Sequence, residues 1–327
     1  MAVKAKANSP AAAGELTARQ RKRKENLKLV KRNYQLYFFL IPAVVFIAVF
    51  MYFPLYGLQI AFKTYCTGDG IWGSEWVGLY WFEQFFRSPN FGTLLANTLI
   101  ISVYSLVVSF PFPIILALIL NYVKNLRFKK FAQTVTYMPY FISTVVLVAM
   151  LELFFSPTSG FINTIIESLG GQAQYFMGES KFFRHLYVWS GVWQSMGYSS
   201  IIYIAALSGV SPELHESATI DGANILQRIL HIDIPTIMPT MVILLIMALG
   251  NVMNVGYEKV YLMQNNANLS TSEVISTYIY KTGMSNGTTQ FSYASAIGLF
   301  NSVVNCAMLV IFNKLATSIG DGGYGLF

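Results

Sequence analysis

Residues 88–123 decide the fold and read SPNFGTLLANTLIISVYSLVVSFPFPIILALILNYV, without a single Asp, Glu, Lys or Arg. A helix of about 20 residues crosses roughly 30 Å of hydrocarbon, so this stretch is long enough to span a membrane. Five further long runs also lack charged side chains, and they cover residues 33–62, 131–151, 185–212, 234–257 and 282–313. The sequence therefore predicts an all-α integral membrane protein with six transmembrane helices.

The composition agrees with this class of protein. Hydrophobic residues make up 54% of the chain and charged residues 11%, whereas a soluble domain carries about 25% charged residues. Backbone groups in lipid must be hydrogen-bonded internally, which favours helices, and the alternating ten-residue pattern of a membrane β-barrel does not occur in the sequence. The predicted spans are 36–60, 94–122, 131–154, 186–208, 239–262 and 291–313.

Lys and Arg are distributed unequally between the two sides of the predicted bundle. Sixteen lie in the N-terminal segment, the loops after the second and fourth spans, and the C-terminal tail, whereas the opposite loops hold five. Because positively charged loops stay in the cytoplasm, we expect both termini there. The chain then divides into a basic, lipid-facing cytoplasmic segment at 1–33, a transmembrane domain at 34–314 and a cytoplasmic tail at 315–327. The net charge of +7 reflects topology, and no nucleic-acid partner is expected.

Motifs for catalysis are absent from the sequence. It contains no G-x-x-x-x-G-K-[ST] loop for ATP, no H-E-x-x-H metal site and no G-x-S-x-G nucleophile. An integral membrane enzyme acting on lipid or glycan would need clustered His, Asp or Glu at one membrane face. A secondary carrier usually keeps ionisable groups near the membrane midplane, but Glu152 and the Glu258–Lys259 pair lie near predicted helix ends. These two classes and a channel remain alternatives to a subunit that is powered by a partner.

The predicted cytoplasmic loop at 209–238 has structure of its own. It contains S-P-E-L-H-E-S-A-T-I-D-G from Ser211 to Gly222, in which Ser is a good N-cap and Pro suits the first helical position. Gly222 can supply a turn that residues with a Cβ resist. We expect a second short helix at 223–231, ended by Pro235 and Pro239 before the fifth span.

This loop resembles the signature of permease subunits of ABC importers, which is E-A-A, three residues, G, nine residues and I-x-L-P. The chain has Glu-Ser-Ala at 216–218, Gly222 at the required spacing and Ile-Asp-Ile-Pro at 232–235. Ser217 and Ile234 are conservative departures from the signature. The segments similar to carbohydrate importers are Ile220-Asp221-Gly222-Ala223, Val77-Gly78-Leu79 with Phe82, and Asn97-Thr98-Leu99. Residues 53–65 resemble a branch that imports oligosaccharides released from polysaccharides, and uronic-acid oligomers such as alginate fragments are among that branch's substrates.

The resemblance implies a six-helix core like that of the maltose importer's permeases, in the bacterial cytoplasmic (inner) membrane. It implies a second homologous permease, two ATPase subunits that bind ATP and Mg, and an extracytoplasmic solute-binding protein. This chain itself would hold no cofactor, no metal and no catalytic residue. In that family the E-A-A helix docks in a cleft of the ATPase. By position, the coupling residues here are Glu216, Ser217, Ala218, Asp221, Gly222 and Pro235.

A sugar pathway needs aromatic rings that stack on C–H faces and amides that form directional hydrogen bonds. Such side chains gather on the fourth and fifth predicted spans. We therefore predict a substrate pathway there, although the same residue types also pack between membrane helices. The predicted pathway residues are Trp193, Gln194, Ser195, Tyr198, Asn251 and Asn254.

Overall fold

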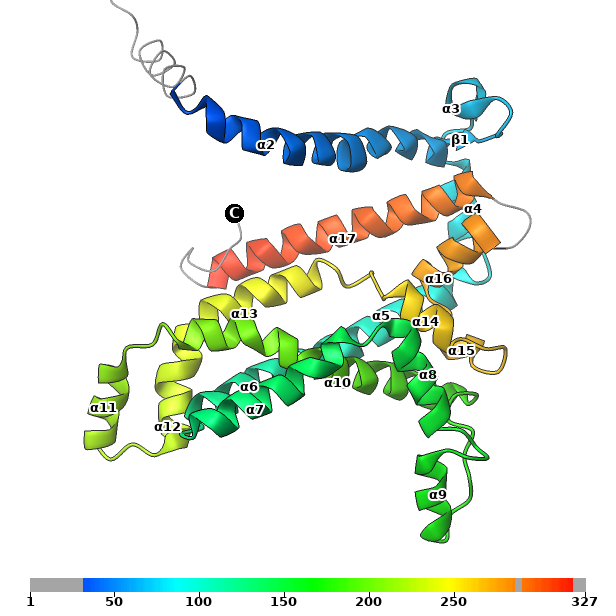
Figure 1. Cartoon of the computed structure of the whole chain (residues 1–327). Helices are drawn as coiled ribbons and strands as arrows, with labels where there is room; N and C mark the ends of the chain where they lie inside the picture. The colour runs from blue at the N-terminus through cyan, green and yellow to red at the C-terminus, as the bar shows by residue number, and fades with distance from the viewer. Residues whose placement is uncertain (1–31, 286–289, 320–327) are drawn as a thin grey trace, which may run out of the picture. The chain divides into compact units, whose positions relative to one another are not determined.

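A computed structural model describes residues 32–285 and 290–319. The chain forms two compact units, Met1–Leu58 and Gln59–Phe327. Most of the basic segment 1–33 and the end of the tail 315–327 lie outside the described residues. The described part is dominated by long helices (Figure 1), as expected for a chain whose backbone groups must pair internally in lipid.

The first unit holds helix α2 (Tyr34–Ile47), the π-helical turn η1 (Ala48–Tyr52) and the beginning of η2 (Phe53–Phe62). Together these elements make one continuous helical span at Tyr34–Phe62, and its most apolar part has no buried residue. A run of exposed Phe, Tyr, Leu and Ile side chains without a charge is stable only where lipid or another protein covers it.

Four groups of helices in the second unit carry the apolar runs. The first group is α5 (Phe91–Ser109) and α6 (Pro111–Tyr122), and the second is α7 (Leu126–Tyr137), η3 (Met138–Phe141) and α8 (Thr144–Phe154). The third group is α12 (Ile225–Arg228), η4 (Ile229–Asp233) and α13 (Ile234–Leu249), and the fourth is the single helix α17 (Phe291–Ile319). Helix α10 (Ser180–Leu207) crosses the middle of this unit and packs on α5, α6, α7 and α13. Its Gly197 faces the Thr136 carbonyl group of α7 so closely that a Cβ would collide with it.

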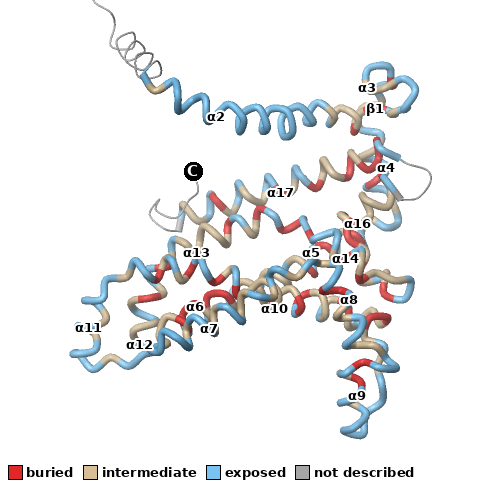
Figure 2. The backbone as a smooth tube through the Cα atoms, viewed as in Figure 1, coloured by how far each residue is buried: buried red, intermediate tan, exposed pale blue. Residues whose placement is uncertain are grey.

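Shorter elements lie around these helices. They are β1 (Lys63–Thr64), α3 (Gly70–Gly73), β2 (Glu75–Trp76), α4 (Tyr80–Phe86), α9 (Phe161–Ser168), α11 (Pro212–Ile220), α14 (Tyr257–Met263), α15 (Leu269–Ser272), α16 (Ile275–Tyr280) and η5 (Lys281–Ser285). Strands β1 and β2 pair antiparallel, with Lys63 opposite Trp76. Helices α9 and α11 project at opposite ends of the second unit (Figure 1). Buried residues gather where α5, α10 and α16 meet, whereas α11 is mostly exposed (Figure 2).

The number of spans is smaller than predicted when it is judged by length and apolarity. Among the described residues, four helices are long and apolar enough to cross a membrane, or five if a bent pair counts as one span. That bent pair is the predicted third span, which is broken by 98° between Phe141 and Thr144. Helix α10 is 28 residues long, but it is not among the four, because Ser, Gly, Gln and Tyr residues make its charge-free part less apolar than the other spans.

The predicted bounds of the fifth span, 239–262, are wrong. The helix runs without interruption from Ile225 to Leu249, and turns follow before α14. The expected break at Pro235 and Pro239 does not occur. Pro235 directly follows the π-helical turn η4, in which the Ile234 N–H bonds to the Ile229 carbonyl group five residues earlier. This wider turn accommodates a proline that has no N–H to donate. The break falls instead after Gly250.

Candidate functional site

Helix α11 forms as the sequence predicts. The Ser211 hydroxyl accepts a hydrogen bond from the Glu213 N–H at 3.3 Å, and Pro212 occupies the first helical position. At the other end, Gly222 has a left-handed φ of 82°. Its neighbour Ala223 donates its N–H to the Ala218 carbonyl group at 2.9 Å, which closes the helix end.

A second helix follows this turn at once. Asn224 and Gln227 form a reciprocal capping box at the start of α12, with hydrogen bonds of 2.8 and 2.9 Å. The Nη1 of Arg228 then donates to the Thr219 hydroxyl of α11 at 2.9 Å. The segment is therefore a helix–turn–helix whose second helix continues directly into α13.

The predicted coupling residues form an accessible surface. Glu216, Ser217, Asp221 and Gly222 are exposed and Ala218 is half-buried, whereas Pro235 is exposed but lies on α13, apart from α11. The neighbouring Ile220 side chain is 87% exposed. A carboxylate beside exposed apolar side chains on a projecting helix is typical of a surface that binds another protein.

Sequence reasoning missed one cluster beneath this surface. Asp233, which is fully buried, accepts a hydrogen bond from the Tyr122 hydroxyl at 2.7 Å. Its other carboxylate oxygen, Oδ1, lies 3.2 Å from Nε2 of His215, which is within ion-pair distance but does not have hydrogen-bond geometry. Tyr122 ends α6, His215 lies on α11 and Asp233 ends η4, so three elements meet at one carboxylate. The sequence feature that could have revealed the cluster is Asp233 itself, a single carboxylate between Ile232 and Ile234.

A cavity of about 660 Å³ lies between α5, α6, α10, α13 and the turns after α13. The Tyr140 and Tyr198 rings stack at its edge, with centroids 3.9 Å apart and planes 4° from parallel. Among the described residues that line the cavity there is no Asp, Glu, Lys, Arg or His. The polar side chains that line it are Ser102, Ser105, Ser109, Tyr140, Tyr187, Ser195, Tyr198, Ser199, Tyr203, Asn251 and Asn254.

Four of the six predicted pathway residues come together at this cavity, namely Ser195, Tyr198, Asn251 and Asn254. Gln194 does not line it, and its amide instead donates to the Ile142 carbonyl group at 2.8 Å. Trp193 lines a separate, apolar cavity of about 440 Å³ between α8 and α10.

Sequence reasoning also missed the serines of α5 that line the same cavity. Ser102, Ser105 and Ser109 follow one another at intervals of three and four residues, so they share one face of the helix. That spacing was the signal by which they could have been found.

These features define a polytopic membrane protein with a cavity lined by tyrosine, serine and asparagine among apolar side chains, and with an exposed helix–turn–helix at 211–228. The family described as binding-protein-dependent transport system inner membrane component matches residues 109–317, and the chain belongs to it. The chain is thus a permease subunit, a transport component of the inner membrane. The family match covers the cavity helices from α6 onwards and the whole helix–turn–helix at 211–228.

Characterised relatives cover nearly the whole chain. The polygalacturonan/rhamnogalacturonan transport system permease protein YteP of Bacillus subtilis (strain 168) is 38% identical over 319 residues, 98% of both chains. Protein LplB of the same organism is 39% identical and covers 90% of this chain and 92% of its own.

One similar solved structure is that of a bacterial ABC transporter involved in the import of the acidic polysaccharide alginate. A chain of that structure matches this one with a TM-score of 0.83 and 36% sequence identity, and the match covers 90% of this chain and 99% of the other. A second structure contains the bacterial alginate ABC transporter in complex with an alginate pentasaccharide-bound periplasmic protein, and its matching chain has a TM-score of 0.82.

Proposed function

We propose that this permease imports uronic-acid-containing oligosaccharides through the 660 Å³ cavity between α5, α6, α10 and α13. The observation that carries the proposal is the lining of that cavity, in which tyrosine rings, serine hydroxyls and asparagine amides converge without a charged group. The relatives named for polygalacturonan, rhamnogalacturonan and alginate support this class of substrate, because polygalacturonan and alginate are polymers of uronic acids.

The cavity suits a sugar chain chemically. Its volume lies within the range of roughly 300–1,000 Å³ that small-molecule sites have. The exposed face of the Tyr140–Tyr198 pair can stack on the C–H face of a sugar ring. Serine and asparagine side chains can donate to and accept from hydroxyl groups. Carboxylates of the substrate would be bound by neutral donors here and by residues of the partner permease, because the described residues that line the cavity include no cation.

The transporter around this chain is proposed to have four further parts. A second, homologous permease completes the pathway, two cytoplasmic ATPase subunits bind ATP and Mg, and an extracytoplasmic protein delivers the sugar. The periplasmic protein in the related alginate structure supports the last of these. The exposed face of α11 docks on the ATPase, where Glu216 pairs with a basic residue, and Ser217, Ala218, Asp221 and Gly222 complete the contact. Pro235 sets the start of α13.

We propose six spans, with α10 as the fourth and the bent pair α7–α8 as the third, and both termini in the cytoplasm. The excess of Lys and Arg in the N-terminal segment and in the loops after the second and fourth spans supports this orientation. Single cysteines at Leu169, 82% exposed, and Ile220, 87% exposed, report the two sides in a background without Cys66 and Cys306. A membrane-impermeant maleimide should label intact cells at 169 only, and labelling at 220 would contradict the orientation.

Uptake by cells that lack the gene and receive it again tests the substrate class. A labelled uronic-acid trisaccharide should enter the complemented cells and not the deletion strain, whereas uptake of a labelled glucose trisaccharide should be the same in both. Gene-dependent uptake of the neutral sugar alone would exclude the uronic-acid substrate, and uptake of neither would exclude the import of oligosaccharides of this size.

A further inference from the structure

The I-x-L-P part of the permease signature leaves one position unspecified, and in this chain Asp233 occupies it. Asp233 is fully buried and meets Tyr122 of α6 and His215 of α11. We propose that the Tyr122–Asp233–His215 cluster is the positioning link that transmits movement of the docking helix α11 to the pathway helices α6 and α13. This inference rests on the proposed function and names residues that the docking surface does not include.

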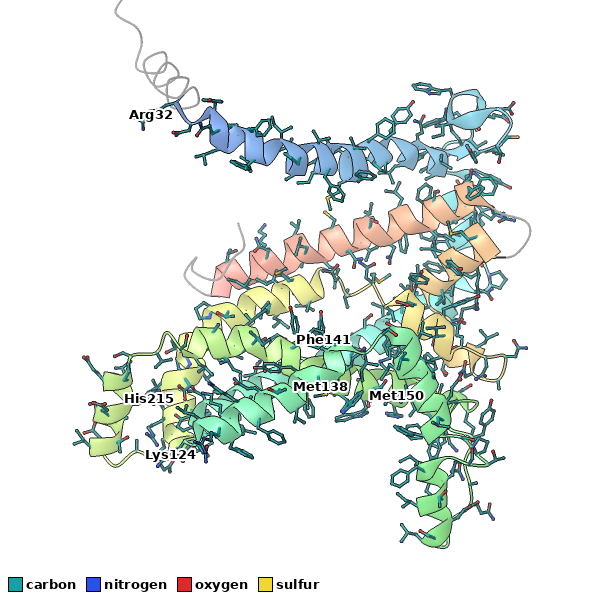
Figure 3. The ribbon with its side chains drawn as sticks, in the orientation of Figure 1. Arg32, Lys124, Met138, Phe141, Met150 and His215 are labelled. Carbon is teal, nitrogen blue, oxygen red and sulfur yellow. The ribbon has the colours of Figure 1, made fainter. Side chains whose placement is uncertain are left out.

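The position of His215 fits this role. It precedes Glu216 by one residue, and successive residues of an α-helix point about 100° apart. The Glu216 side chain is exposed to a partner, whereas the His215 side chain is 22% exposed and turns inward to Asp233. Figure 3 labels His215 on α11 and Lys124 just beyond α6, at the same end of the second unit. A force applied at the exposed face of α11 therefore reaches Asp233 through the adjacent residue.

A second contact holds the same face of α11. Thr219 lies four residues after His215, so the two side chains are neighbours along the helix. Its hydroxyl accepts from Arg228 at 2.9 Å, and the Arg228 guanidinium lies 5.6 Å from the centre of the Tyr122 ring. Two tethers one turn apart prevent α11 from pivoting freely about either one. Helix α11 is therefore bound to α12 and η4 as a unit.

A buried carboxylate is costly unless it is paired and hydrogen-bonded. Asp233 accepts a hydrogen bond from Tyr122 through one oxygen, and its other oxygen has His215 as a neighbour at ion-pair distance. A displaced α11 would remove His215 and leave the carboxylate with Tyr122 alone. The cluster therefore resists displacement of α11 relative to α6 and η4.

The elements that meet at Asp233 continue to the cavity. Helix α6 forms one span with α5, which carries the serine face, and Pro113 of α6 lines the cavity. Helix α13 follows η4 without a break, and its Leu244 and Ala248 line the same cavity. Rigid helices transmit displacement along their length. The cluster therefore joins the docking surface to two walls of the pathway.

The test compares His215→Ala, His215→Gln and Asp233→Asn in the complete transporter, reconstituted with its ATPase and binding protein. The readout is the number of sugars transported per ATP hydrolysed. A purely structural defect would reduce the amount of assembled complex, but it would leave this ratio unchanged. His215→Ala and Asp233→Asn should lower this ratio roughly tenfold, in the range of typical coupling effects, with basal hydrolysis retained. His215→Gln keeps an N–H donor near Asp233 and should restore at least half of the ratio.

His231→Ala is the matched control. It removes the same side chain from the same segment, but the His231 ring is 2.9 Å from the Gln227 carbonyl oxygen of its own helix and does not contact Asp233. Its ratio should equal that of the unchanged transporter. A normal ratio in His215→Ala and Asp233→Asn, or an equal loss in His215→Gln and His215→Ala, would overturn the inference. Gly222→Val in the same assay separates this inference from the proposed function. If Gly222→Val loses coupling while His215→Ala stays normal, the cluster is not the link, but docking through α11 still stands.

Discussion

Gly222→Val should lower transport and substrate-stimulated ATP hydrolysis at least about tenfold, while the protein still inserts in the membrane. Gly222 has a φ of 82°, and a Cβ built on it meets no atom within 4 Å. The effect therefore comes from the backbone alone. A left-handed conformation costs a residue with a Cβ about 1–2 kcal/mol, and more for a β-branched one. The turn between α11 and α12 should change shape, and the docking surface with it.

Asparagine at the same position is the matched control, because Asn tolerates the left-handed region better than other residues with a Cβ. Gly222→Asn should keep most of the transport, whereas Gly222→Val should lose at least about tenfold, which corresponds to roughly 1.4 kcal/mol. Uptake and ATP hydrolysis measured in the same vesicles give both numbers. Normal transport by the valine variant would show that this turn has no part in coupling.

Tyr198→Ala should reduce oligosaccharide uptake more than any other single change in the cavity. The substitution removes the ring that stacks on Tyr140, and with it the aromatic face that we assign to the sugar. Aromatic stacking on a bound ring is worth on the order of 1 kcal/mol beyond the buried area, so we expect a loss of uptake of roughly tenfold or more. Assembly and basal ATP hydrolysis should remain, because Tyr198 is 44% exposed and not part of the core.

Two further variants make this prediction specific. Asn251→Ala removes an amide that donates to the Met247 carbonyl group and accepts from the Asn254 amide, and it should lower uptake several-fold. Trp193→Ala truncates a larger aromatic side chain on the same helix, but that side chain lines the separate apolar cavity, so uptake should stay near normal. A larger loss with Trp193→Ala than with Tyr198→Ala would assign the pathway to the other cavity.

The helix–turn–helix at 211–228 could be predicted from the sequence because its structure depends on local interactions. The N-cap at Ser211, the proline in the first turn and the left-handed Gly222 each act within a few residues. Those predictions are confirmed. The limits of the fifth span were wrong, because the effect of a proline depends on its helical position and on the π-helical turn before it.

The cavity and the buried cluster depend on contacts between distant segments. Tyr122 and Asp233 are 111 positions apart, and no local pattern pairs them. Ser195 and Trp193 are near neighbours on one helix, yet they line different cavities, since the helices packed against α10 decide which face is open. Composition indicated the correct kind of side chain for a sugar pathway, while the packing of α5, α10 and α13 determined which of them lie together.

ATP hydrolysis by the purified complete transporter in lipid vesicles tests the central claim most directly. The claim is that this chain forms a sugar pathway whose use is coupled to partner ATPases through α11. Hydrolysis should rise several-fold when the binding protein is loaded with a uronic-acid oligosaccharide, with uptake of that sugar into the vesicles, and the rise should vanish with Gly222→Val. Equal hydrolysis with and without the loaded binding protein, or sugar uptake that needs no ATP, would contradict the account.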